Sequence, residues 1–231
     1  MLSTAKKELS KDVKNSKEHP ARIIKVDPSR NLQSAVNRAA DSLLSGGLVA
    51  YPTESFYGLG VDATNEEAIK RLFLVKQRRT SRPVLILIPS LDLLEQYVKH
   101  IPPIAYQLIE AFWPGGLSLV FGAGPKVTSL LTAGTGKIGI RLSSHPVATA
   151  LTRAIGVPIT GTSANISGEP ACRNVGEVLE SFGDGVVDLI LDGGETPGEI
   201  GSTVLDVTVD PARILRHGMV HKNQLGKFMR I

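Results

Sequence analysis

The chain has 231 residues, of which 42% are hydrophobic and 21% charged. This balance is ordinary for a soluble globular protein and excludes wholesale disorder, and the length suits one domain or at most two. Lys and Arg number 26 and Asp and Glu 22, so the net charge of +4 permits a polyanionic partner without requiring one. Aromatic residues make up only 5%, which argues against a base-stacking platform for single-stranded nucleic acid.

Apolar spacing and turn residues predict strands and helices that alternate along the chain. In chain order we expect a strand at 22–26, a helix at 32–44, a strand at 48–51, a helix at 65–76, a strand at 83–88, helices at 91–97 and 104–112, strands at 117–121 and 138–142, a helix at 146–155, a strand at 157–160, a helix at 175–182, and strands at 189–191, 203–207 and 214–215. The alternation predicts the α/β class, as a single domain with a twisted mixed sheet flanked by helices.

Residues 1–20 carry five lysines among three acids and lack the apolar core of a secretory signal. We expect 1–20 to be a mobile polar tail and 21–231 to be the folded domain. The single cysteine, Cys172, cannot form an internal disulfide, and no His and Cys residues have zinc-site spacing. This pattern leads us to expect a cytoplasmic protein with no structural metal. Because no apolar run approaches the roughly 20 residues of a membrane span, we also expect no membrane partner.

Three familiar motifs fail on inspection. The glycines 134, 136 and 139 match G-x-G-x-x-G, but they lead into a predicted strand instead of the helix that a dinucleotide site requires. Gly136-Lys137 lacks the upstream glycine of a Walker A loop. Ser163 lies in Gly-Thr-Ser-Ala-Asn, which is not the nucleophile elbow of an esterase. The chain therefore offers no obvious covalent nucleophile.

Four polar segments interrupt the apolar pattern, at 52–60, 76–83, 161–168 and 201–203, the last followed by Arg213 and Arg216. The first and third follow predicted strands, where ligand crevices of α/β sheets form. Cations, hydroxyls and flanking glycines together favour phosphate binding. Simpler interpretations stay open, because a basic helix end, a polar turn or a capping Thr53 would look the same.

The motifs, taken in order, resemble a known family. They are Pro-Thr-Glu-Ser-x-Tyr-Gly-Leu, Lys-x-Arg, Phe-Trp-Pro-Gly, Arg-x-x-x-His-Pro, Thr-Ser-Ala-Asn-x-Ser-Gly and Ser-Thr-Val-x-Asp. Their combination resembles the YrdC family of threonylcarbamoyl-adenylate synthases over about 22–220, in its short form without an extra C-terminal domain. The resemblance implies a YrdC-like catalytic domain with a central concave cleft.

The resemblance also implies an activity, namely the synthesis of threonylcarbamoyl-adenylate and pyrophosphate from L-threonine, bicarbonate and ATP for tRNA modification. Mg²⁺ would arrive with ATP, and no tightly bound cofactor is expected. A downstream threonylcarbamoyl transferase complex would take the product, and tRNA binding would be weak. The enzyme needs no nucleophile of its own, because the carbamate of threonine attacks the α-phosphorus; it must orient two anions and neutralise the leaving pyrophosphate.

Site residues follow from the resemblance, position by position. Lys76 and Arg78 would contact the triphosphate, and Ser163 and Asn165 the α-phosphate and the reacting carbamate. The remaining predicted contacts are Thr53 and Arg141 for threonine, and Ser202 and Arg216 for the nucleotide.

The sequence departs from the family pattern at Arg82, Gly116, Ser118, Ser143 and Leu87. Ser143 stands where the resemblance implies proline, and Leu87 where the longer members have histidine and the short form also has leucine, so these departures concern the threonine contacts.

Other functions on this fold remain open. The chief alternative is a module that binds double-stranded RNA or tRNA or acts in ribosome maturation, although 22 acids nearly balance the 26 basic residues. A carbamoyl-transfer domain of hydrogenase maturation normally belongs to a much larger protein. An inactive paralogue would lose Lys-x-Arg or Ser-x-Asn, and both are present here.

Overall fold

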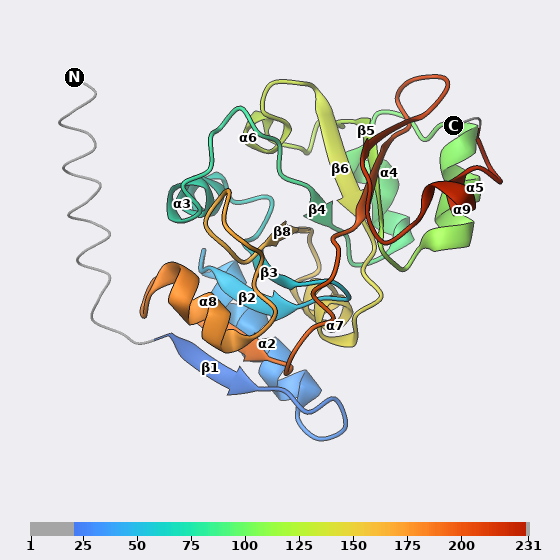
Figure 1. The fold of residues 1–231 in the computed structure, drawn as a ribbon. Coiled ribbons are helices and arrows are strands. Elements are labelled where there is room, and N and C mark those ends of the chain that lie inside the picture. Colours follow the sequence, from blue (N-terminus) through green and yellow to red (C-terminus); the bar gives the residue numbers. More distant parts are fainter. Residues whose placement is uncertain (1–20, 230–231) are drawn as a thin grey trace, which may run out of the picture.

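The strands form two mixed sheets, one with five strands and one with six (Figure 1). The computed structural model describes residues 21–229. Its strands are β1 Arg22–Lys25, β2 Val49–Pro52, β3 Tyr57–Gly60, β4 Ile86–Leu87, β5 Leu117–Gly122, β6 Lys137–Arg141, β7 Ile159–Thr160, β8 Thr162–Ser163, β9 Leu189–Asp192, β10 Thr203–Asp206 and β11 Arg213–Arg216. Its helices are α2 Leu32–Leu44, α3 Glu66–Val75, the 3-10 turn Leu91–Leu93 with α4 Leu94–Tyr97, α5 Pro103–Phe112, α6 Ser129–Thr132, α7 Pro146–Ile155, α8 Val175–Phe182 and α9 Lys222–Leu225.

Parallel and antiparallel pairs occur in both sheets. The five-stranded sheet has the order β1-β9-β2-β3-β8, with β9 parallel to both of its neighbours and β3 antiparallel to β2 and β8. The six-stranded sheet has the order β11-β10-β5-β6-β4-β7, with parallel pairs at β10–β5 and β6–β4. The sheets meet where β3 runs on to Val61, whose carbonyl accepts a hydrogen bond from Thr160 of β7. One buried cluster joins residues of both sheets, so they form a single domain.

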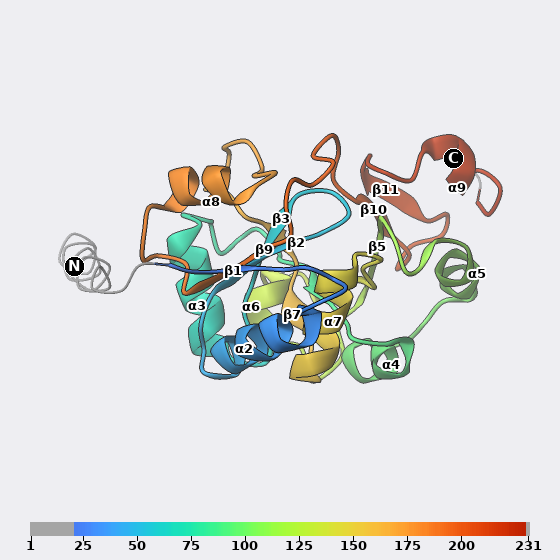
Figure 2. The same ribbon diagram turned by 90° about the horizontal axis from the view of Figure 1, so that it is seen from below.

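Helices cover both faces of the five-stranded sheet. Figure 2 shows α2 and α7 together on one face and α8 on the other. The buried positions of α2 recur every three or four residues, which gives it an apolar face against α7, β2 and β9. Local signals set the helix ends: Asn65 caps α3 by accepting from Glu67 N and Ala68 N, and Gly156 ends α7 in the left-handed conformation.

The predicted α/β class and mixed pairing are confirmed, with the strands divided between two sheets. Every predicted helix is present, and α2, α7 and α8 have the predicted bounds. The predicted strand at 83–88 shortens to Ile86–Leu87. The glycines 134 and 136 lie in a turn that leads into strand β6 and not into a helix, as predicted when the dinucleotide motif was rejected. The tail assigned to 1–20 lies outside the described residues.

The sequence did not predict strand β3, because two of its four residues are glycines inside a polar segment. Both glycines have a packing reason. The ring of Tyr51, on the neighbouring strand β2, lies over them, and a Cβ atom at Gly58 or Gly60 would come within 2.8 or 2.9 Å of it. Only glycine therefore allows β3 to pair with β2 at this place. Strand β8 and helices α6 and α9, each of two to four residues, were missed as well.

Within residues 21–229, no helix is both long and apolar enough to cross a membrane.

Candidate functional site

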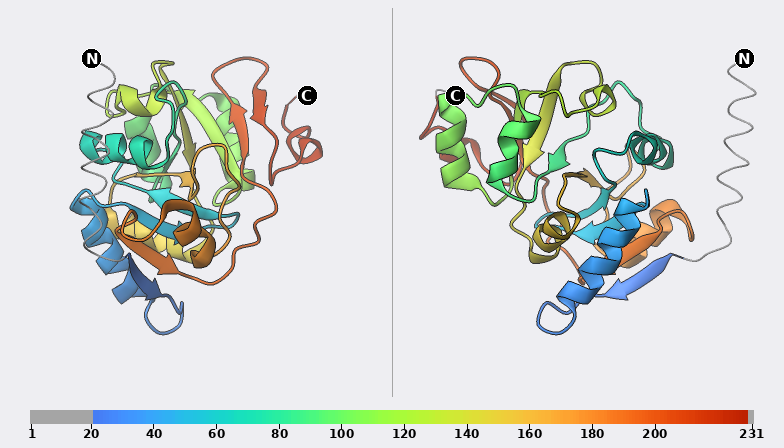
Figure 3. Two further views of the ribbon diagram at one scale, coloured as in Figure 1. Left: turned by 60° about the vertical axis from the view of Figure 1, so that its left-hand side comes forward. Right: turned by 180° about the vertical axis from the view of Figure 1, so that it is seen from behind.

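A cavity of about 680 Å³ is lined by residues of both sheets. β2, β3 and β8 contribute to one side of it, and β5, β6, β10 and β11 to the other. Figure 3 shows the strands of the two sheets from two further directions. Six of the eight predicted site residues line the cavity: Thr53, Arg78, Arg141, Ser163, Ser202 and Arg216.

Arginine side chains dominate the charge of the cavity. Arg78 donates to the carbonyl of Pro83 at 2.7 Å, and Arg216 donates to the carbonyl and hydroxyl of Ser202 at 2.8 and 3.0 Å. In the part of the chain that the structure describes, neither forms an ion pair with a carboxylate. Burial lowers the pKa of both guanidinium groups, and Arg82 and Arg216 lower that of Arg78 further. Two neighbouring guanidinium groups that form no ion pair within residues 21–229 favour an anionic ligand.

Arg141, the third arginine of the cavity, is compensated by an acid. It ends strand β6 and forms an ion pair with Glu54, which follows β2; the two side chains are 7% and 11% exposed. Ser143 donates to the other Glu54 oxygen at 2.6 Å. The Arg141 Nε atom is buried and has no partner within residues 21–229. The Nη donors that Glu54 leaves free suit the carboxylate of a ligand in the cavity.

Lys76 and Asn165 do not line the cavity. Lys76 is 1% exposed, and its Nζ donates to the carbonyls of Ser163 and Asn165 at 2.5 and 2.6 Å. Burial, and then the neighbouring charge of Arg78, lower its pKa to about 7. The ammonium thus lies beneath the segment that carries Ser163. A direct contact between this ammonium and a triphosphate would require these two hydrogen bonds to break. That contact stays a prediction.

The side chains of the two polar loops are fixed by internal hydrogen bonds. Asn165 accepts from Ser163 Oγ at 2.5 Å and donates to the carbonyls of Ile166 and Glu169 at 2.9 and 2.7 Å. Thr53 Oγ1 donates to the carbonyl of Phe56 at 2.6 Å. These bonds are the local loop contacts that the simpler interpretation of each segment expects, and the roles of these groups in binding stay predictions.

Sequence reasoning missed three charged residues of the site, Glu54, Lys137 and Glu199, of which Lys137 and Glu199 line the cavity. Glu54 stands inside the first polar segment, but its partner Arg141 is 87 residues away, and no spacing signals such a pair. Lys137 lines the cavity and donates to Asp206 at 2.8 Å. Leu87, one of the departures named above, is fully buried and does not line the cavity; Leu85 does.

A second cavity, of about 790 Å³, lies beside α5 and the 207–212 loop, and none of the predicted site residues lines it. Among residues 21–229, no three His, Cys, Asp or Glu side chains are grouped so that they could hold a metal ion.

Comparison with known proteins gives the same family as the motifs. Threonylcarbamoyl-AMP synthase of Pyrococcus abyssi is 40% identical over 82% of this chain and 55% of its own length. The synthase of Klebsiella pneumoniae is 35% identical over 74% of this chain and 93% of its own length. The crystal structure of Pyrococcus abyssi Sua5 complexed with L-threonine superposes with a TM-score of 0.86 at 35% identity, covering 92% of this chain and 61% of that one.

Relatives of two lengths are thus found, and this chain spans 55% of the length of the Pyrococcus abyssi and Bacillus subtilis proteins. The family model Sua5_yciO_yrdC, described as telomere recombination, matches residues 41–218. That range includes all eight predicted site residues. The chain therefore belongs to the Sua5/YciO/YrdC family.

Proposed function

We propose that this protein is a threonylcarbamoyl-AMP synthase. It would convert L-threonine, bicarbonate and ATP into threonylcarbamoyl-adenylate, pyrophosphate and water. The observation that carries the proposal is the cavity between the sheets. There, within residues 21–229, Arg78 and Arg216 form no ion pair with a carboxylate, and Arg141 keeps Nη donors that Glu54 does not use. Relatives of similar length carry the same activity in their names, which supports the proposal.

The chemistry suits a site without a protein nucleophile. The amine of threonine adds carbon dioxide and loses a proton, which gives a carbamate. A carbamate oxygen then attacks the α-phosphorus of ATP, a P–O bond forms, and the bond to pyrophosphate breaks. Three anionic groups must therefore come together, and their repulsion opposes the reaction. Fixed guanidinium groups at partly buried positions offset that repulsion and stabilise the charge that develops on the leaving group.

Residue roles follow from position in the cavity. Arg78 and Arg216 would neutralise the triphosphate, and Ser202, which is bonded to Arg216, would contact it as well. Ser163 at the cavity wall would meet the α-phosphate and the carbamate. Asn165 would act through its hydrogen bond with Ser163.

Threonine would lie on the other side of the reacting phosphorus. Arg141 would take its carboxylate, and Thr53, beside it in the lining, would contact the rest of the amino acid. Lys76 would hold the 163–165 segment in place through its two carbonyl bonds.

The remaining partners follow from the reaction. Mg²⁺ would enter bound to the phosphates of ATP as part of the substrate. The product is a reactive mixed anhydride, so a threonylcarbamoyl transferase complex acting on tRNA is the expected consumer. Weak tRNA binding and a cytoplasmic location fit this role and are part of the proposal.

Pyrophosphate release tests the proposal directly. We expect release with L-threonine, bicarbonate and ATP together, and only background release when any one is omitted. Release from ATP alone, unaffected by threonine, would indicate a plain ATPase. A protein that releases no pyrophosphate but binds tRNA with a steep salt dependence would favour the RNA-binding alternative.

A further inference from the structure

The guanidinium of Arg141 is only partly used within the protein. A guanidinium has five N–H donors. In the described part of the chain, the Arg141 side chain makes one hydrogen bond, from Nη1 to Glu54 Oε1. Its Nε is buried without a partner although the residue lines the cavity. Nε is shielded from solvent, so the donors available to a ligand in the cavity are the Nη hydrogens that Glu54 leaves free.

Glu54 is itself held from two sides. Arg141 donates to one carboxylate oxygen, and the Ser143 hydroxyl donates to the other at 2.6 Å. The Ser143 oxygen also accepts from the backbone N–H of His145 at 3.2 Å. Its lone pair and its proton thus both have partners, which fixes the direction of the hydroxyl. A residue without a hydroxyl at position 143 would leave one Glu54 oxygen without this donor.

The pair also links the two sheets. Glu54 follows β2 of the five-stranded sheet, whereas Arg141 and Ser143 lie at the end of β6 of the six-stranded sheet. Both charged side chains are almost entirely buried, so water cannot compensate either one if its partner is removed. Glu54 therefore fixes the position of Arg141 before any ligand arrives.

We propose that Glu54 is a positioning residue, which holds Arg141 so that its free guanidinium donors face the cavity and bind the carboxylate of the amino-acid substrate. This inference rests on the proposed function, in which L-threonine supplies that carboxylate. A long arginine side chain that is already fixed loses little conformational freedom when the substrate binds. Glu54 touches no substrate in this scheme, so its effect passes entirely through Arg141.

The variant Glu54→Gln keeps the size of the side chain and removes its charge. We expect the affinity for L-threonine, measured by calorimetric titration, to fall about tenfold or more, as for a weakened charge-assisted contact. The KM for ATP should change less than about twofold, because Arg78 and Arg216 keep their contacts. Ser143→Ala should weaken threonine binding in the same direction and by less, because Arg141 still holds one Glu54 oxygen.

A double-mutant cycle separates positioning from a general effect on the fold. In the Arg141→Met background, Glu54→Gln should cause no further loss of threonine affinity, since there is no guanidinium left to position. Thermal unfolding of each variant shows whether it is folded, and the milder Ser143→Ala decides the matter if Glu54→Gln does not fold.

Three results would overturn the positioning role. The first is an unchanged threonine affinity in Glu54→Gln, or in Ser143→Ala where Glu54→Gln does not fold. The others are equal losses of affinity for threonine and for ATP in Glu54→Gln, and a loss of threonine affinity that Glu54→Gln still causes in full in the Arg141→Met background. A wild-type protein that binds ATP but no L-threonine would instead contradict the proposed function.

Discussion

Replacement of Lys76 by methionine tests the unusual environment of this lysine. Lys76 is 1% exposed. Its Nζ donates to the carbonyls of Ser163 and Asn165 and has no carboxylate partner within residues 21–229. Methionine fills similar space, but it cannot donate to those carbonyls. The variant should therefore lose two hydrogen bonds, at about 1–3 kcal/mol for each carbonyl left unsatisfied, and at the same time remove a costly buried charge.

The balance between these effects depends on pH. The pKa of Lys76 is 10.5 in the unfolded chain and about 7 in the folded protein. Between these pH values the unfolded state binds more protons than the folded state, so this lysine makes the free energy of unfolding rise with pH. Below pH 7 the buried charge destabilises the folded protein to its full extent. From pH 7 to pH 9, the free energy of unfolding should rise by about 2 kcal/mol through Lys76 alone.

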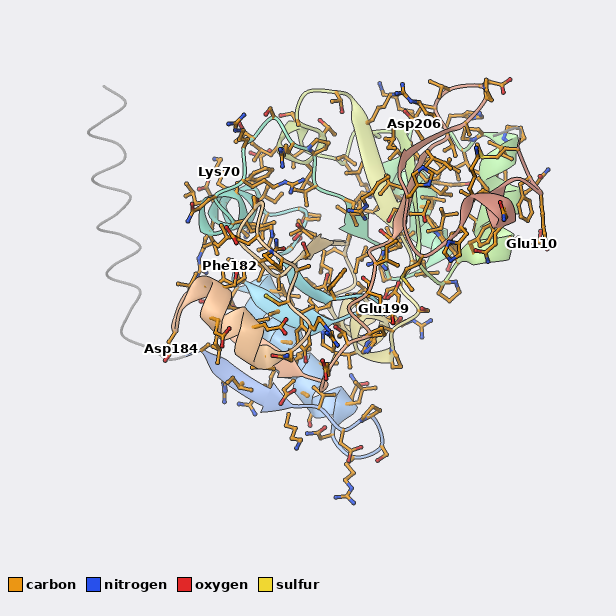
Figure 4. All side chains as sticks on the ribbon, in the orientation of Figure 1. Lys70, Glu110, Phe182, Asp184, Glu199 and Asp206 are labelled. Atoms are coloured by element: carbon orange, nitrogen blue, oxygen red, sulfur yellow. The ribbon has the colours of Figure 1, made fainter. Side chains whose placement is uncertain are left out.

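Urea unfolding at pH 7 and pH 9 measures this rise in the wild type and in Lys76→Met. The destabilisation caused by Lys76→Met should be about 2 kcal/mol larger at pH 9, because all other groups titrate alike in both proteins. Lys70→Met is the matched control, since Lys70 lies on helix α3 (Figure 4), which ends next to Lys76, but is exposed and has a raised pKa. A destabilisation that is the same at both pH values would refute the claim that Lys76 is buried without a compensating charge.

Kinetics of the same variant separate support of the 163–165 segment from direct triphosphate contact. If Lys76 supports the segment, turnover should fall while the KM for ATP stays within a few-fold of the wild type. A loss of ATP affinity as large as that of Arg78→Ala would instead assign the ammonium to the triphosphate.

Three further predictions concern the cavity and the ends of the chain. Arg78→Ala should raise the KM for ATP about ten- to a hundredfold, whereas Arg79→Ala, at the next position, which is exposed and does not line the cavity, should not; equal effects would contradict the cavity assignment. Gly161→Ala should lower the melting temperature and turnover, because a Cβ there would approach Leu85 Cδ1; kinetics and melting like the wild type would refute the tight packing. Deletion of 1–20 should leave the steady-state kinetics unchanged, and a large loss would give the tail a role in the site.

The sequence predicts best where local chemistry decides the structure. Helix α7 has its predicted bounds because Pro146 opens it and Gly156 ends it, and both effects act within one turn. Strand β3 shows the opposite case. Its two glycines, taken alone, predict a loop. They fit a strand because the Tyr51 ring packs over them, and that contact belongs to tertiary packing.

The site shows the same division. Arg78 and Arg216 are 138 positions apart, and only the resemblance to a family, not their spacing, indicated that they meet. Lys76 stands in a strongly basic segment, where a lysine is expected to be exposed, yet its side chain is buried under the 163–165 segment. Long-range contacts of this kind leave no periodic signal in the chain. The connection between β9 and β10, which carries Glu199 to the cavity (Figure 4), is a further example.

The fate of the bicarbonate carbon tests the proposed synthesis most directly. With ¹⁴C-bicarbonate, L-threonine and ATP, label should appear in an adduct that contains AMP and threonine, in amounts equal to the pyrophosphate released. The label should be absent without threonine and reduced in step with pyrophosphate in Arg78→Ala. Pyrophosphate release without labelled adduct, or labelled adduct without threonine, would contradict threonylcarbamoyl-adenylate synthesis by this protein.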